Sequence, residues 1–284
     1  QISGAGAVAT IEGATFSDCA AGADGGSIRA FNGATVKISG TTFQRSSSQG
    51  NGGALALLGV HANSYVATST FEDCTSALSG GAMWVSHFLM QYPLAPLLST
   101  VIFESCTFER NAAQKGGAFT VATQSSVTIQ SSQFKNNTAS QEGGALSVAT
   151  ESSVTVQDSL FTDNTATDSG GAMAVTAEAS ASIQVSRFEG NRALGLGGAA
   201  LRVSASNVEL FANSFIGNVA DNGGGGALLW DGNRVPNVHT ACFYGWFAEP
   251  GPANDGVSYC VPCPPGSYKD DVTAAACSQC EVGK

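Results

Sequence analysis

The chain has 284 residues, of which 43% are hydrophobic and only 12% are charged, and it contains 35 glycines. This composition excludes a disordered chain, supplies enough apolar side chains for a continuous core, and requires many turns. The formal charge of −10 disfavours binding to nucleic acid or to an anionic membrane, because both are polyanions.

A repeat runs through most of the chain. One phenylalanine recurs every 26 to 28 residues, with one longer interval of 37, at Phe16, Phe43, Phe71, Phe108, Phe134, Phe161, Phe188 and Phe215. A Gly-Gly pair follows each phenylalanine, beginning at residues 25, 52, 80, 116, 143, 170, 197 and 225. In the last five units an asparagine stands three residues after the phenylalanine, at Asn111, Asn137, Asn164, Asn191 and Asn218. The repeat therefore holds its register through eight units.

Apolar and polar residues alternate inside each unit. Leu146 and Val148 follow one Gly-Gly pair, and Val154 and Val156 follow after a short polar turn. A period of two predicts strands with one buried face. A unit of about 27 residues cannot enclose a core alone, so its neighbours must stack on it. We therefore predict an all-β fold, a right-handed parallel β-helix of about eight coils, over residues 1–230.

Stacking in register places like residues over like, ~4.8 Å apart. The phenylalanines are predicted to form an internal aromatic ladder, and the asparagines a ladder of side-chain amides. The Gly-Gly pairs indicate a tight turn with positive φ or a close backbone approach. Because Cys19, Ser46 and Cys74 occupy the asparagine position in the first three units, the sequence does not support the amide ladder there.

The first unit has no Gly-Gly-Ala segment before Ile11, so we expect the chain to begin part-way round a coil. Either a segment precedes Gln1, or Gln1 to Thr10 forms an irregular cap over the first coil. Any targeting segment is removed or lies upstream, because the chain begins without an initiator Met or an apolar leader.

Three cysteines lie inside the repeat. Cys19 and Cys74 occupy equivalent positions two coils apart, and this separation of ~9.6 Å exceeds the reach of a disulfide, so we expect buried thiols. Cys74 and Cys106 lie in adjacent coils but five residues out of phase. A bridge between them would require the long interval to bend the chain.

The 37-residue interval contains an apolar insertion of roughly ten residues, between Ser86 and Leu98. It contains two prolines and is far shorter than the ~20 residues of a membrane-spanning helix, so we expect no membrane insertion. An apolar loop that projects from a solenoid suggests a partner contact. The alternative is that it folds back over an outer sheet face or over Trp84. The candidate contact residues are Phe88, Leu89, Met90, Tyr92 and Leu94.

The one N-x-S/T sequon of the chain begins at Asn136. The equivalent positions in the other units hold charged or small residues, which predicts that this column faces solvent. Asn136 is therefore a candidate glycosylation site in a protein secreted by a eukaryote. The alternative is an unmodified turn asparagine.

Composition changes after Trp230. Residues 231–256 are a predicted cap or linker, and residues 257–284 are the predicted start of a small cysteine-rich module that continues beyond Lys284. Two C-x-x-C pairs with 13 residues between them could hold zinc or form disulfides, and the four residues are Cys260, Cys263, Cys277 and Cys280. Cys242 is left over, and its partner is not predicted.

Two resemblances bear on function. The Phe-x-x-Asn and Gly-Gly-Ala-Leu motifs of residues 11–230 resemble the repeats of chlamydial polymorphic membrane proteins, which implies a surface-exposed adhesive β-helix. The Cys-Pro-Pro-Gly-Ser-Tyr segment that begins at Cys263 resembles the ephrin-receptor-like cysteine-rich repeats of extracellular proteins. That resemblance implies the pairs Cys260–Cys277 and Cys263–Cys280.

We therefore expect a non-enzymatic extracellular or cell-surface scaffold whose partners are proteins or copies of itself, with glycans as a further class. The alternative function is polysaccharide binding or processing. No cofactor or metal is predicted, because the three histidines are isolated and the acids lie in loops without a convergent basic partner, as at Asp18, Asp73, Asp163 and Asp168. An ice-binding threonine array is not expected either, since the outward position of the second strand holds Lys37, Ala67, Ile102, Thr128, Thr155, Gln184 and Glu209.

The compartment can be tested by measuring the intact mass of the secreted chain before and after reduction and deglycosylation. We expect a mass gain on reduction that corresponds to two tail disulfides, and a mass loss on deglycosylation at Asn136. Fully reduced tail cysteines that carry zinc would contradict the extracellular assignment.

Overall fold

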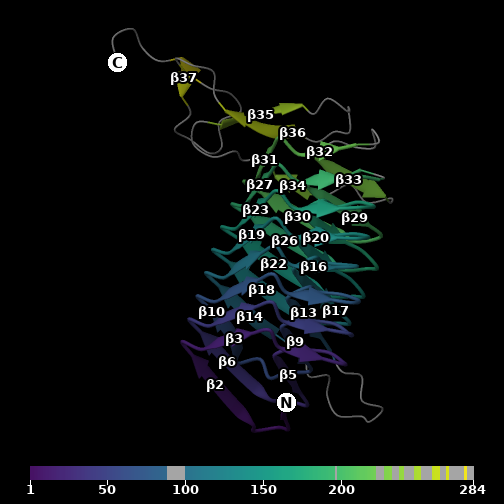
Figure 1. Cartoon of the computed structure of the whole chain (residues 1–284). Coiled ribbons are helices and arrows are strands. Elements are labelled where there is room, and N and C mark those ends of the chain that lie inside the picture. Colours follow the sequence, from purple (N-terminus) through teal and green to yellow (C-terminus); the bar gives the residue numbers. More distant parts are fainter. Residues whose placement is uncertain are drawn as a thin grey trace.

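The computed structural model describes residues 1–87, 100–195, 197–221 and 227–231, together with the backbone of five short strands beyond residue 236. Short strands and turns follow one another around a common axis and build a rod (Figure 1). The described residues contain no helix, and hence none that is long and apolar enough to cross a membrane.

Each full coil contributes one strand to each of four parallel sheets, named A to D in chain order. Sheet A has nine described strands: β1 (Ile2–Ser3), β5 (Ile28–Phe31), β9 (Leu55–Leu58), β13 (Met83–Ser86), β17 (Phe119–Ala122), β21 (Leu146–Val148), β25 (Met173–Val175), β29 (Leu201–Ser204) and β33 (Leu228–Asp231). Sheet B also has nine described strands: β2 (Val8–Glu12), β6 (Thr35–Ser39), β10 (Ser64–Ala67), β14 (Thr100–Glu104), β18 (Ser126–Gln130), β22 (Ser153–Gln157), β26 (Ser180–Gln184), β30 (Asn207–Phe211) and β34 (Asn237–His239).

Sheets C and D are built from shorter strands. Sheet C has eight described strands: β3 (Thr15–Ser17), β7 (Thr42–Gln44), β11 (Thr70–Glu72), β15 (Thr107–Glu109), β19 (Gln133–Lys135), β23 (Leu160–Thr162), β27 (Arg187–Glu189) and β31 (Ser214–Ile216). Sheet D has eight two-residue strands in the described chain: β4 (Ala20–Ala21), β8 (Ser47–Ser48), β12 (Thr75–Ser76), β16 (Ala112–Ala113), β20 (Thr138–Ala139), β24 (Thr165–Ala166), β28 (Arg192–Ala193) and β32 (Val219–Ala220). The predicted parallel β-helix of about eight coils is confirmed.

The two ends of the rod differ from expectation in one respect each. Gln1 to Thr10 forms β1 and β2, which pair in register with the second coil, as Ile2 does with Ala30. The alternative of an irregular cap is therefore wrong, because this segment makes regular sheet. At the other end, β34 extends sheet B into the predicted cap or linker of residues 231–256.

The remaining tail strands form two antiparallel pairs. One pair joins β35 (Trp246–Pro250) to β36 (Ser258–Pro262), and the other joins β37 (Ser267–Tyr268) to β38 (Ser278–Gln279). Strand β36 lies beside β31, the last described strand of sheet C (Figure 1).

The predicted aromatic ladder occupies the inner side of sheet C. Successive phenylalanine rings from Phe16 to Phe215 stack with centroids 4.7 to 5.0 Å apart and planes within 2 to 14° of parallel. The six phenylalanines between these two are fully buried. Each ring fills the space above the previous ring, so the aromatic column forms a continuous part of the core along the rod.

The asparagine ladder lies at the corner between sheets C and D and runs from Asn111 to Asn218. The Asn164 amide nitrogen donates to the Phe134 carbonyl oxygen and to Asn191 Oδ1, both at 2.9 Å. Its own Oδ1 accepts from the backbone nitrogen and from the Nδ2 of Asn137, at 3.0 and 2.9 Å. Every polar group of this buried amide is therefore satisfied by a neighbouring coil.

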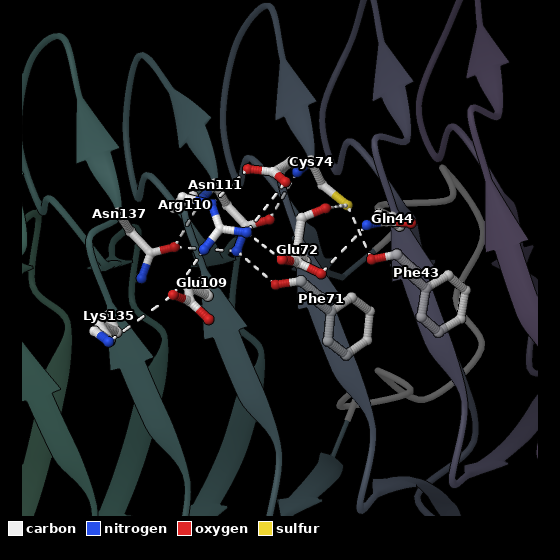
Figure 2. A network of polar contacts seen from close by, with 11 residues as sticks. Phe43, Gln44, Phe71, Glu72, Cys74, Glu109, Arg110, Asn111, Lys135 and Asn137 are labelled. Carbon is white, nitrogen blue, oxygen red and sulfur yellow. Dashed lines mark hydrogen bonds and ion pairs between the residues drawn. The ribbon is translucent and has the colours of Figure 1, made fainter.

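The ladder stops where the sequence predicts. The backbone N–H of Cys74 donates to Asn111 Oδ1 at 2.9 Å, and the Cys74 thiol contacts the Phe43 carbonyl oxygen at 3.6 Å (Figure 2). A thiol is a weak donor and a weak acceptor, so Cys74 does not continue the series of side-chain hydrogen bonds into the earlier coils.

The Gly-Gly pairs meet two separate backbone requirements. The first glycine has positive φ, as at Gly143 with φ 67°. A Cβ on the second glycine would meet the next coil, as at Gly144, where it would lie 2.0 Å from the Gly171 carbonyl oxygen. In the seventh coil the predicted pair at residue 197 is one residue out of register, and the equivalent residue is Gly198, with φ 65°. The preceding turn holds the extra residue.

Substitution of Gly144 tests the second requirement. Gly144→Ala is expected to lower the free energy of unfolding by about 3 kcal/mol, because the added methyl group collides with rigid backbone. Gly22→Ala is the matched control, since its Cβ would have no atom within 4 Å, and it should change stability by less than about 0.5 kcal/mol. Urea unfolding followed by circular dichroism measures both, and equal stabilities would contradict the close approach.

Truncation of one asparagine side chain tests how much the asparagine ladder contributes to stability. Asn164→Ala leaves polar groups of Asn137 and Phe134 buried without partners and should lower the free energy of unfolding by about 3 kcal/mol. Asn207→Ala, on the exposed outer side of β30, should have almost no effect. If the two variants lowered the free energy of unfolding by the same amount, the ladder would not be the stabilising feature.

Candidate functional site

Sheets A, B and C each present a long outer face, and the three faces differ in what their outward side chains do. On sheet A the outward column is largely covered by the chain itself. Ala56 and Ala174 are fully buried, and Ser147 is 1% exposed. The turn glycines lie directly over them, since a Cβ on Gly170 would approach the Ala174 methyl group to 3.2 Å. Most of this face is not available to a partner.

On sheet C ion pairs occupy the outward column that follows the phenylalanines, together with the adjoining corner. Arg110 follows β15 and contacts three carboxylates, those of Glu72, Asp73 and Glu109 (Figure 2). Its Nε lies 2.9 Å from Asp73 Oδ1, and its Nη1 lies 2.7 Å from Glu109 Oε1. These contacts raise the pKa of Arg110 further above its ordinary value, chiefly through the hydrogen bonds to Asp73 and Glu72. Lys135 lies 4.0 Å from Glu109 in the next coil.

The same corner holds a second pair two coils earlier. Arg45 forms a two-pronged hydrogen bond with Asp18, at 2.7 and 2.8 Å. The hydrogen bond from Arg45 lowers the pKa of the exposed Asp18 carboxyl. The expectation that Asp18 and Asp73 have no basic partner is therefore wrong: each pairs with the arginine one coil further on. The partners are 27 and 37 residues apart in sequence but share one column.

On sheet B three successive strands present a repeated uncharged pattern. The outward residues of β18, β22 and β26 lie in register and form what we call the neutral face: Ser126, Thr128, Gln130, Ser153, Thr155, Gln157, Ser180, Ser182 and Gln184. The hydrogen bonds among these side chains within the described chain are those from Ser153 to Ser126 and from Gln184 to Ser182. The other side-chain donors and acceptors of the face are free to bind a partner.

Two apolar side chains continue the central column of the neutral face. Tyr65 pairs with Ile102, and Ile102 pairs with Thr128. Tyr65 is 36% exposed and Ile102 is 42% exposed. The sequence alignment placed Ala67 and Gln184 in this central column, but the structure places Tyr65 and Ser182 there. The column still lacks a regular threonine lattice.

The two central cysteines are free thiols, so the alternative of a Cys74–Cys106 bridge is wrong. Cys74 follows β11 and Cys106 precedes β15, which puts them at opposite corners of sheet C. Burial raises the pKa of both thiols to about 11, so they remain protonated at neutral pH. The prediction of a buried thiol is confirmed for Cys74, whereas Cys19 in the first coil is half-buried.

The predicted modification and contact residues have different outcomes. Asn136 is exposed and occupies the turn between β19 and β20 with φ 54°, and Thr138 of its sequon is also exposed. Glycosylation there stays a prediction. The insertion residues lie outside the described part of the chain, and so do the side chains of the tail cysteines: Phe88, Leu89, Met90, Tyr92, Leu94, Cys242, Cys260, Cys263, Cys277 and Cys280.

Among the described residues, no group of three or more histidine, cysteine or acidic side chains could hold a metal ion. Asp18 and Asp73 at the sheet C corner are held by arginines in surface ion pairs. Such an arrangement can fix neighbouring coils in register, and its chemistry gives no reason to assign a reaction to it.

The fold and its faces define the chain as a parallel β-helix repeat protein. The family model described as "Right handed beta helix region" matches residues 1–188, and the chain belongs to this family. That description specifies a fold and no reaction. No match was found among curated proteins or among solved structures.

Proposed function

We propose that the chain is a non-catalytic scaffold with an adhesive role at a cell surface or in an extracellular assembly. The observation that carries this proposal is that the recurring positions of the repeat contact the next coil and not a partner. The phenylalanines, the asparagines and the turn glycines all contact their own counterparts in the next coil. The most regular part of the sequence therefore serves stacking, which yields a rigid rod with long faces.

A rod of this kind suits multivalent attachment. Successive coils repeat at the 4.7 Å spacing of the phenylalanine rings, so one face offers the same groups several times over. A partner with its own repeat can engage several coils at once, and its avidity then exceeds the affinity of one contact. The partners we propose are surface proteins, further copies of the chain, or glycans.

The extracellular location is supported by the sequence of the tail and by the surface of the rod. The two C-x-x-C pairs are typical of a disulfide-stabilised extracellular module. The exposed turn at Asn136 is accessible to an attached glycan. The resemblance of the repeats to surface adhesins points to the same compartment.

Bead adhesion tests the proposed function. Latex beads coated with the full chain should adhere to cells of the source organism, and the adhesion should require the folded rod. Beads coated with the Gly22→Ala variant should adhere like wild type, whereas beads coated with Gly144→Ala should adhere less in proportion to the unfolded fraction.

The same preparations should release no reducing sugar from a panel of polysaccharides. Adhesion no stronger than that of albumin-coated beads would contradict the adhesive role. If the wild-type chain releases sugar and an affinity-purified preparation of Gly144→Ala does not, the activity belongs to the folded chain. That result would contradict the non-catalytic assignment.

A further inference from the structure

We propose that the neutral face and the Tyr65–Ile102 pair together bind an uncharged, extended polysaccharide laid along the rod. This inference rests on the proposed adhesive function and names the class of partner. It starts from a contrast among the three outer faces: most of sheet A is covered by its own turns, one of the two outward columns of sheet C holds ion pairs, and three successive strands of sheet B present free hydrogen-bonding groups in every outward column.

The free groups form a grid with two repeats. Along the rod, equivalent side chains recur once per coil, at the 4.7 Å spacing of the stacked rings. Along each strand, outward residues such as Ser153, Thr155 and Gln157 recur every second position, about 7 Å apart. Each coil thus offers two hydroxyl groups and an amide in the same order.

A grid of identical groups favours a ligand that is itself a regular polymer. One sugar residue of an extended glycan advances by about the spacing of one coil, so a chain laid across the strands meets an equivalent set of groups at each residue. Hydroxyl and amide side chains both donate and accept hydrogen bonds, which matches the hydroxyl groups of a sugar. Several weak contacts then add up along the chain.

The charges on and around the face select against ionic polymers. The nine residues of the neutral face include no ionisable side chain. Glu104 and Glu209 pair with Gln130 and Ser182 at its borders, and the chain as a whole carries a charge of −10. Among the described residues, the one cation next to the proposed surface is Lys37, which pairs with Tyr65 at the far end from the neutral face. The two glutamates and the overall charge disfavour an anionic polysaccharide, while a cationic polymer would find no carboxylate within the face.

The Tyr65–Ile102 pair offers a contact for the apolar side of a sugar ring. A pyranose has an apolar side of C–H groups, and an exposed aromatic ring such as that of tyrosine offers a flat apolar surface on which this side can pack. Tyr65 and Ile102 occupy the same column as Thr128 and Thr155. A glycan that contacts the hydroxyl column therefore reaches this apolar pair at its end.

The observations favour a glycan over a protein partner. The centre of a protein interface is usually a larger apolar cluster with aromatic anchors. Here three exposed apolar residues, Tyr65, Ile102 and Phe211, adjoin nine hydroxyl and amide residues, and that proportion suits a hydrated, hydroxyl-rich ligand.

Affinity electrophoresis tests the inference with the full chain. Native gels are cast with a neutral polysaccharide (hydroxyethylcellulose, laminarin or glucomannan) or with an acidic one (polygalacturonate or alginate). Wild-type protein should be retarded in at least one neutral gel and in neither acidic gel. Gln157→Arg places a charge and a long side chain in the face and should abolish the retardation.

Two matched controls keep the test specific. Gln133→Arg adds the same charge to an exposed glutamine on sheet C and should leave the retardation unchanged. Tyr65→Ala should weaken the retardation, whereas Leu78→Ala, which truncates another exposed apolar side chain, should not. Thermal unfolding by circular dichroism verifies that all four variants are folded.

Several results would overturn the inference: no retardation in any neutral gel, stronger retardation in an acidic gel, or equal retardation of the Gln157→Arg and Gln133→Arg variants. Bead adhesion distinguishes this failure from failure of the proposed function. If wild-type beads adhere to cells but no neutral gel retards the chain, the scaffold role stands and the assigned glycan is wrong.

Discussion

In-register hydrogen bonding between the backbones of successive coils is the constraint on which the rest of the structure depends. Once equivalent residues lie 4.7 Å apart, each side chain must pack against the equivalent side chains of the coils before and after it. Phenylalanine rings stack, and amides bond in both directions because each carries donors and an acceptor. Glycine is required where the next coil leaves no room for a Cβ. In the exposed corner column like charges would repel, and Asp18, Arg45, Asp73 and Arg110 alternate in sign.

This constraint separates stability from function. The residues that make the repeat recognisable face inward or face the next coil, where solvent and partners do not reach them. The outer faces are under weaker constraint, so their side chains are where binding can be built. The turns cover most of one face, and ion pairs occupy one column of a second. On sheet B three successive strands combine regular order with unused hydrogen-bonding groups in all their outward columns.

The candidate site was only partly predictable from the sequence. The exposure of the turn at Asn136 could be predicted from the charged and small residues at the equivalent position of the other repeat units. The same alignment of units puts Asp18 and Arg45 in one column with opposite charges, so this ion pair could also have been predicted. Tyr65 was missed because its unit was aligned two residues out of register. The outward residue of the central column lies six residues before the phenylalanine, as Thr128 does before Phe134. Six residues before Phe71 is Tyr65, so the sequence already contained this position. The neutral face follows once the strands are aligned by their pairing.

The sequence by itself determined the repeat, the number of coils, the strand periodicity and the two internal ladders, because these depend on contacts between residues of one type at one spacing. The tertiary structure decided the rest: the register at Gly198, the separation of Cys74 from Cys106 and the composition of each outer face. The physical reason is that turns of variable length lie between the strands. Backbone pairing realigns the strands after each turn, and a residue count along the chain does not.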